Sequence, residues 1–250
     1  RSVPKVRPTV PRYIHFDLGI SGDALGFAMG HVSKFDIVKK VDRNTGHEFE
    51  VKIPHAYIDL MLRVIPVKGS KIRISAVRDF IFALRSYGFP IAKVTADTFQ
   101  STDILQQLIR AGFQAEVLSL DVAKEKTGHP YAFLREAIME RRASYYHYPQ
   151  FIAEAGNLQR FDIVSQAKVK WKVDHPQKMR DLDGNPVKGA KDVSDSVGGV
   201  VYHCMVQPPD VDPPPVTPAQ AMMSVKSASQ TKNRFIQSSQ HWAVGDDYRP

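Results

Sequence analysis

The sequence has little cysteine and no long apolar run, and each absence excludes a class of protein. A single cysteine, Cys204, occurs in 250 residues, so neither an internal disulfide nor a cysteine-based zinc site can form. No run of about 18 apolar residues and no signal-peptide pattern is present, so we expect neither a membrane span nor secretion. These absences predict an intracellular protein.

A glycine-rich phosphate loop is also absent, because no glycine is followed at the required spacing by Gly-Lys and then Ser or Thr. The chain is therefore not expected to hydrolyse ATP. The formal net charge is +8, which favours a polyanionic partner such as DNA, because lysine and arginine displace the counterions condensed on phosphates.

Composition divides the chain into three parts. Residues 1–12 are basic, contain three prolines and lack acidic residues, which predicts an extended linker. Six prolines occur between residues 208 and 218, and a Ser/Gln-rich segment follows them, so residues 208–250 are expected to be a linker and a flexible tail. The folded body is expected over residues 13–207. Because the chain begins at Arg1 without a methionine, we also expect a fragment of a longer protein.

Apolar periodicity in the body predicts an α/β fold with a mixed sheet. Three strands, at residues 13–19, 26–39 and 48–66, are expected to form an antiparallel meander. Strands at 91–96 and 114–120 alternate with helices, which indicates a parallel portion of the same sheet. Flanking helices are expected over residues 75–87, 103–111, 131–142, 151–158 and 192–205, and a hairpin-like excursion between residues 169 and 186.

Four aspartates fall at positions suited to a ligand site. Asp17 lies in the apolar first strand, where a charge is costly unless a group such as a metal ion compensates it. Asp97 ends a later strand, and ligands collect at the carboxyl ends of strands in alternating sheets. Asp192 and Asp195 are three residues apart at the start of the last helix, which places both on one helical face. Each acid also has a structural alternative, as a strand end, a helix cap or a partner of the helix dipole.

The combined placement of these acids favours a metal site. Carboxylates from the first strand, a later strand and the last helix can converge on one point if the first strand is central. Mg²⁺ and Mn²⁺ prefer oxygen ligands, and a pair of such ions can stabilise both the attacking and the leaving oxygen in phosphodiester cleavage.

Three segments resemble the nuclease domain of the large terminase subunit of tailed bacteriophages, in their order and spacing. They are HFDLGISGDALGFAMGH at residues 15–31, VTADTFQSTDILQQL at residues 94–108, and KVDHP followed by KGAKDVSDSVGGVVY at residues 172–176 and 188–202. The resemblance covers residues 13–205 and rests on all three segments together, since each alone is weakly specific.

The resemblance implies an RNase H-like fold and a metal-dependent endonuclease that cleaves concatemeric double-stranded viral DNA during genome packaging. By position, Asp17 and Asp97 match two of the family's catalytic, metal-binding acids, and the third matches either Asp192 or Asp195. The family uses Mg²⁺ or Mn²⁺, with two ions expected. It also implies an upstream ATPase domain joined through residues 1–12, a small terminase subunit and a portal as partners, and the host cell cytoplasm as location.

A second expectation concerns DNA binding. Lys168, Lys170 and Lys172 alternate along an expected strand, and residues 160–191 contain eight basic and four acidic residues. Beside a nuclease site this pattern predicts a phosphate-tracking surface, to which Lys191 would add, and a solvated strand face is the alternative.

Two other functions stay open at this stage. One is a Holliday-junction resolvase or transposase-type nuclease of the same fold. The other is a non-catalytic DNA-binding or assembly module in which the aspartates are caps.

Overall fold

The computed structural model describes residues 4–19, 24–41, 45–67, 70–97, 101–120, 129–165 and 168–206. Residues 1–3 of the predicted linker and the predicted tail over residues 208–250 lie outside this range.

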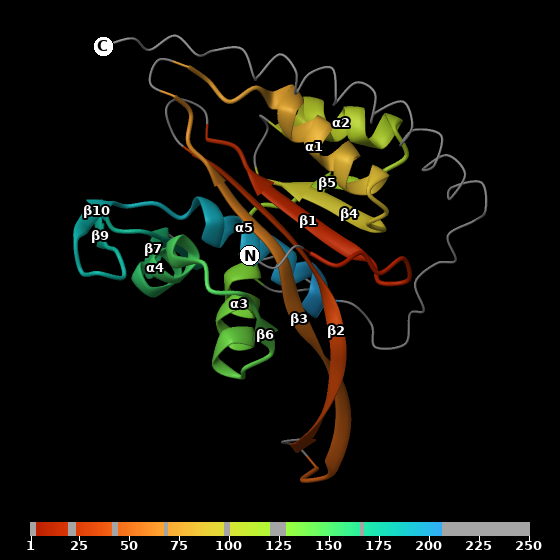
Figure 1. Cartoon of the computed structure of the whole chain (residues 1–250). Coiled ribbons are helices and arrows are strands. Elements are labelled where there is room, and N and C mark those ends of the chain that lie inside the picture. The colour runs from red at the N-terminus through yellow and green to blue at the C-terminus, as the bar shows by residue number, and fades with distance from the viewer. Residues whose placement is uncertain are drawn as a thin grey trace, which may run out of the picture.

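A six-stranded mixed sheet forms the centre of the molecule, with the strand order β5-β4-β1-β2-β3-β6 (Figure 1). The strands are β1 (Arg12–Asp17), β2 (Leu25–Val41), β3 (Glu48–Val64), β4 (Ile91–Ala96), β5 (Ala115–Val117) and β6 (Ala143–Ser144). The first three form an antiparallel meander, and β4 and β5 run parallel to β1 on its other side. The predicted mixed sheet is therefore confirmed, and β1 lies in its interior.

Helices cover both faces of the sheet (Figure 1). They are α1 (Ile74–Ser86), α2 (Thr102–Arg110), α3 (Pro130–Met139), α4 (Pro149–Asn157) and α5 (Asp192–Met205). One apolar cluster joins α1 and α2 to the sheet, and a second joins α3, α4 and α5 to its other face. The helix α5 contacts β1, β2 and β3 and begins and ends where the sequence predicts.

The residues of β1 alternate between these two clusters. Ile14 and Phe16 belong to the cluster under α1 and α2, and Tyr13 belongs to the cluster under α5. Because successive side chains of a strand point to opposite faces, the odd-numbered residues of β1 face α5. Asp17 is one of these residues.

Two small ribbons replace the single hairpin expected between residues 169 and 186. The first pairs β7 (Gln159–Ser165) with β8 (Lys168–Asp174), and the second pairs β9 (Lys178–Arg180) with β10 (Pro186–Lys188) around the predicted turn. The expectation missed β7, a seven-residue strand in which Phe161 and Ile163 alternate with Arg160 and Asp162 and which pairs with β8.

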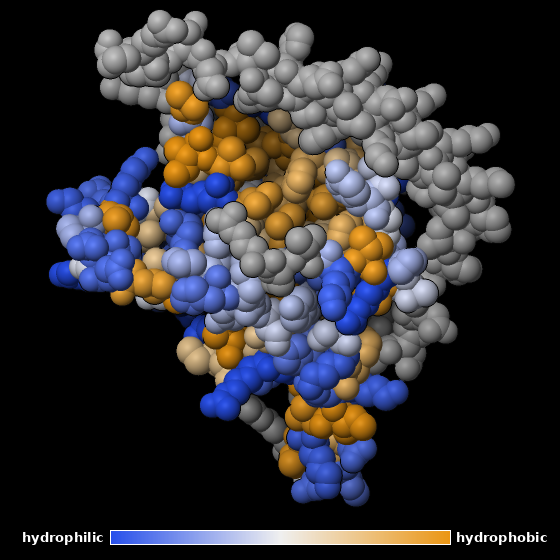
Figure 2. Space-filling view, viewed as in Figure 1, coloured by the Kyte–Doolittle hydropathy of each residue, from blue (hydrophilic) through white to orange (hydrophobic). Residues whose placement is uncertain are grey.

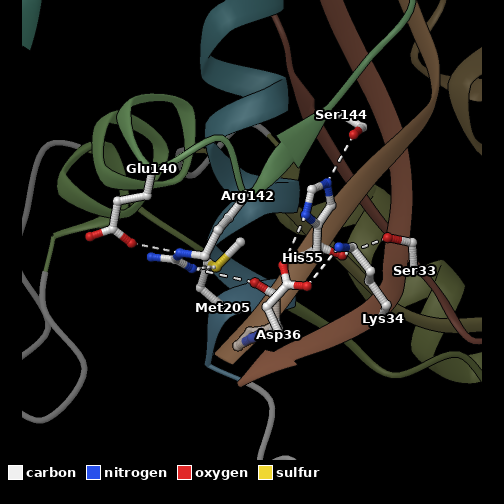
Figure 3. A network of polar contacts seen from close by, with 9 residues as sticks. Ser33, Lys34, Asp36, His55, Glu140, Arg142, Ser144 and Met205 are labelled. Atoms are coloured by element: carbon white, nitrogen blue, oxygen red, sulfur yellow. Dashed lines mark hydrogen bonds and ion pairs between the residues drawn. The ribbon is translucent and has the colours of Figure 1, made fainter. Parts of the chain in front are cut away.

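The β2–β3 hairpin extends well beyond the rest of the sheet (Figure 1). Its free end exposes apolar side chains between charged ones, among them Ile37, Val41 and Phe49 (Figure 2). Where the hairpin leaves the sheet, His55 on β3 joins it to the edge strand β6 (Figure 3). The Nε2 atom of His55 lies 2.8 Å from Ser144 Oγ, and its Nδ1 atom lies 3.4 Å from Asp36 Oδ2.

Arg142 strengthens the same junction from the loop after α3 (Figure 3). Its Nη1 atom donates to the carbonyl oxygen of Pro54 on β3 at 3.3 Å, and its Nε atom donates to Glu140 at 2.7 Å. The guanidinium is nearly buried, so the hydrogen bonds offset the cost of removing its charge from water. The hairpin is thus attached to both β6 and α3 at its base.

Candidate active site

Asp17 and Asp97 lie side by side at the carboxyl edge of two neighbouring strands. Asp17 is the last residue of β1, and Asp97 directly follows β4. The two strands are parallel and adjacent, with Phe16 paired to Ala96, so the residues after this pair are also neighbours. Adjacent strands are about 4.8 Å apart, which brings the two acids within reach of one ion or one phosphate.

Asp17 points to the face of the sheet that α5 covers. His15 Nδ1 lies 2.8 Å from Thr95 Oγ1, and the same hydroxyl lies 3.2 Å from His203 Nε2 on α5. Asp17 follows His15 by two residues within β1, which places its side chain on the same face, and Asp97 follows Thr95 by two residues just beyond the end of β4. Burial, and then the nearby His203, lower the pKa of His15 to about 3, so this ring is neutral and structural.

Two glycines allow α5 to lie close against this part of the sheet. A Cβ atom on Gly26 would lie 1.8 Å from the backbone oxygen of Asp192, and a Cβ atom on Gly199 would lie 2.2 Å from the His15 ring. Gly26 is paired with Asp17 across the β1–β2 ladder. The start of α5 therefore lies against Gly26 of β2, beside the end of β1.

Asp195 is the helix acid that approaches Asp17. Its side chain is almost fully buried, accepts a hydrogen bond from the Tyr131 hydroxyl and lies 3.3 Å from the Lys191 Nζ atom. Burial raises the pKa of Asp195 well above its usual value, Lys191 opposes the rise, and the charge of Asp17 adds to it. The carboxylates of Asp17 and Asp195 are therefore close enough to repel each other.

Asp192 has a different partner, although the sequence predicts that both helix acids share one face. Its Oδ2 atom accepts a hydrogen bond from Arg63 Nε on β3 at 3.0 Å. Arg63 is paired with Gly26 in the β2–β3 ladder, so Asp192 reaches across the sheet away from β4. The charge of Asp17 therefore acts on Asp195, while Asp192 is joined to β3 through Arg63.

Glu154 belongs to the same region and was not predicted from the sequence. This residue lies on α4 with no exposed side-chain surface, and its Oε2 atom accepts hydrogen bonds from the backbone N–H groups of Val193 and Ser194 at 2.9 and 2.8 Å. Burial raises the pKa of Glu154, while hydrogen bonds from Gln150 and Ser194 oppose the rise. The contacts join residues about forty positions apart, and no local pattern predicts such a pair.

The predicted DNA-binding lysines are only partly described. The side chains of Lys168 and Lys170 lie outside the described part of the structure. Lys172 Nζ lies 2.8 Å from Asp174 Oδ2 with much of its surface exposed, and Lys191 is the lysine beside Asp195. The ribbon formed by β9 and β10, near these lysines in the chain, is largely hydrophilic at its surface (Figure 2).

The β7–β8 ribbon is attached close to this site by stacked side chains. His129 stacks on Trp171 of β8 with ring centroids 3.9 Å apart, and the Arg160 guanidinium lies 4.9 Å from the centroid of the same ring. His129 also precedes α3, and its Nδ1 atom accepts a hydrogen bond from the backbone N–H of Tyr131, the residue that contacts Asp195. The stack therefore fixes a basic ribbon beside the acids.

The chemistry of these side chains fits a divalent cation. The candidate donors are carboxylate oxygens, which Mg²⁺ and Mn²⁺ prefer. Two of them, on Asp17 and Asp195, repel each other, and the ammonium group of Lys191 already lies against Asp195. Within the described residues no three His, Cys, Asp or Glu side chains are close enough together to form a finished metal site.

Comparisons with known proteins give matches only among solved structures. No family model matches the chain, and no curated protein matches it. No helix in the described ranges is long and apolar enough to cross a membrane.

The solved structures that match include large terminases of phages. The large terminase nuclease from thermophilic phage G20c with bound magnesium has 17% identity and a TM-score of 0.50, over 78% of this chain and 82% of that one. Another structure of the G20c nuclease gives 18% identity and a TM-score of 0.46, over 79% and 84%. The HK97 bacteriophage large terminase gives 13% identity and a TM-score of 0.46, over 80% of this chain and 40% of that one.

At these identities the likeness shows the fold alone. This chain therefore has the RNase H-like fold found in the nuclease domains of phage large terminases.

Proposed function

We propose that this chain is a metal-dependent endonuclease that cleaves double-stranded DNA during the packaging of a phage genome. The observation that carries the proposal is the pair of acids at the adjacent ends of β1 and β4, together with the effect of the Asp17 charge on Asp195 of α5. The fold supports it, since phage large terminase nucleases share this fold.

Asp17, Asp97 and Asp195 would hold the divalent cations, Mg²⁺ or Mn²⁺, with two ions expected. When bound, such ions stabilise negative charge on the attacking and the leaving oxygen of a phosphodiester. Asp192 would contribute indirectly, because its carboxylate is bound to Arg63.

The remaining residues would orient the substrate and the acids. Tyr131 and Lys191 hold the two oxygens of Asp195, and the cationic end of Lys191 could meet the scissile phosphate. Lys172, with Lys168 and Lys170, would contact the backbone of the duplex, which positions DNA without reading its sequence.

The wider setting is part of the same proposal. An ATPase domain, the small terminase subunit and the portal would be the partners of this chain, and the host cell cytoplasm its location.

Cleavage of supercoiled plasmid in the presence of Mn²⁺ or Mg²⁺ tests the proposal. We expect cleavage by the unaltered protein and a loss of about a thousandfold or more in Asp17→Asn and in Asp195→Asn, because each metal ligand contributes several kcal/mol to the transition state. Asp192→Asn should lose less. Asp79→Asn, an exposed acid on the opposite face, is the matched control and should retain full activity.

Cleavage that persists in Asp17→Asn would refute the assignment. Preference for four-way junctions over linear duplex would point to a resolvase-type nuclease instead. Salt-sensitive DNA binding without any metal-dependent change in melting temperature would indicate a non-catalytic binding module.

A further inference from the structure

The first turn of α5 receives its cap from another helix. The first N–H groups of a helix have no partners within it, and the lysine at the N-cap, Lys191, does not cap them with its side chain, because an ammonium group cannot accept a hydrogen bond. Glu154 of α4 fills this role, because one of its oxygens accepts from both Val193 and Ser194. Its negative charge also interacts favourably with the positive end of the helix dipole. The position of α5 thus depends on a carboxylate that is distant in sequence.

Arg63 holds the same turn from the sheet. Its Nε atom lies 3.0 Å from Asp192 Oδ2 and 4.0 Å from Glu154 Oε1. Gly26 on β2 is paired with Asp17 on one side and with Arg63 on the other, so these three residues form one row across the sheet. The side chains of Arg63 and Asp17 are therefore on the same face. The first turn of α5 is therefore held by Glu154 of α4 and by Arg63 of β3, and Arg63 lies in the same row of the sheet as Asp17.

Asp195 lies in this same first turn, one residue after Ser194. The backbone N–H of Asp195 donates to the Lys191 carbonyl at 2.7 Å, so the residue follows any movement of the turn. A shift of the turn along or around the helix axis would change the separation between the carboxylates of Asp195 and Asp17. Mg²⁺ requires oxygen ligands at about 2.0–2.1 Å in near-octahedral geometry, so a small shift would weaken binding.

We propose that Glu154 and Arg63 are positioning residues of the nuclease site, which orient Asp195 toward Asp17 by fixing the first turn of α5. The inference rests on the proposed nuclease function. It also gives Asp192 a role, as the carboxylate through which Arg63 binds the turn.

Replacing Glu154 in the full chain tests the proposal. In Glu154→Ala the concentration of Mn²⁺ at half-maximal plasmid cleavage should rise by about 10- to 100-fold, as is common when a group supporting a metal ligand is lost. The dissociation constant for Mn²⁺, measured by calorimetry without DNA, should rise by a similar factor. Affinity for DNA measured without divalent cations should stay unchanged.

Glu154→Gln is the conservative variant. Its amide oxygen can still accept hydrogen bonds from Val193 and Ser194, so most of the Mn²⁺ affinity should return. Arg63→Met should shift the Mn²⁺ dependence in the same direction as Glu154→Ala. These two variants carry the test if Glu154→Ala fails to fold.

Leu84→Ala is the control for a loss of stability alone. Leu84 is buried in the cluster on the opposite face of the sheet, between α1 and the strands. This variant should lower the melting temperature and leave the Mn²⁺ dependence of cleavage unchanged.

Two failures can be told apart. If the unaltered protein neither cleaves plasmid nor binds Mn²⁺, the nuclease function fails and the positioning role fails with it. If the unaltered protein does both, and Glu154→Ala shows the same Mn²⁺ dependence as Leu84→Ala, only the positioning role is refuted.

Discussion

The close approach of α5 to the sheet depends at the residue scale on Gly26. A methyl group there would lie 1.8 Å from a backbone oxygen and 2.6 Å from Ser196 Oγ, and a backbone oxygen cannot rotate away. Gly26→Ala should therefore lower the free energy of unfolding by about 1–3 kcal/mol, as overpacked cores do. It should also weaken metal-dependent cleavage, because α5 must move away from Asp17. Urea unfolding and plasmid cleavage measure the two effects.

Gly156→Ala is the matched control for this prediction. Gly156 lies within α4, and a Cβ atom there would have no atom within 4 Å. The substitution should stabilise the protein by about 0.5–1 kcal/mol, because alanine favours the helix more than glycine does. If Gly26→Ala and Gly156→Ala have the same free energy of unfolding and the same rate of cleavage, the contact between α5 and the sheet tolerates a methyl group at residue 26.

The residues of the candidate site differ in how far the sequence could predict them. Asp17 and Asp97 could be placed because a charge at the end of an apolar strand is a local pattern. The sequence predicts both Asp192 and Asp195, because the contact that distinguishes them, between Asp192 and Arg63, joins α5 to β3 over a long distance in sequence. Glu154 had no local pattern at all, since its role arises only when α4 packs against α5.

At the scale of elements, the projecting β2–β3 hairpin depends on the network around His55. This side chain connects β3 to β6 through Ser144 and to β2 through Asp36. His55→Ala should lower the free energy of unfolding by about 1 kcal/mol, the usual value of a lost hydrogen bond. The amides of β2 and β3 near the junction should also exchange hydrogen faster, since the hairpin base would open more often.

His47→Ala is the comparison for this element. His47 is exposed beside the hairpin turn, so its substitution should change neither stability nor amide exchange at the junction. Unchanged exchange in His55→Ala would mean that Arg142 and the strand ladder hold the hairpin without the histidine.

Elements with strong periodicity could be predicted, and elements that depend on pairing could not. The meander and α5 have clear alternating or helical patterns, and the structure confirms both. The edge strand β6 consists of two residues, which cannot show a period, and exists because Ala143 and Ser144 pair with β3. The far half of β3 also alternates, with Phe49, Val51 and Ile53 between Glu48, Glu50 and Lys52, although none of these six residues is buried.

At the scale of the whole molecule, charge is distributed unevenly relative to the candidate site. The net charge is +8, yet the edge formed by β1, β4 and α5 collects acids. Basic residues of the β7–β8 ribbon lie beside them, attached through the His129–Trp171 stack. A duplex bound along this ribbon would reach the acids, and its affinity would depend on the lysines of the ribbon. The affinity of a duplex bound along the β2–β3 hairpin would not depend on those lysines.

Salt dependence of DNA binding tests this arrangement. Each phosphate contact contributes about one unit to the slope of log affinity against log salt, so Lys172→Gln should lower that slope by about one. Lys34→Gln is a close control, because both lysines bind an aspartate two residues later, at 2.8 Å in the ribbon and 2.6 Å in the hairpin. Lys34→Gln should leave the slope unchanged. If Lys34→Gln lowers the slope and Lys172→Gln does not, the duplex binds along the hairpin, because a lysine contributes to the slope only where it contacts a phosphate.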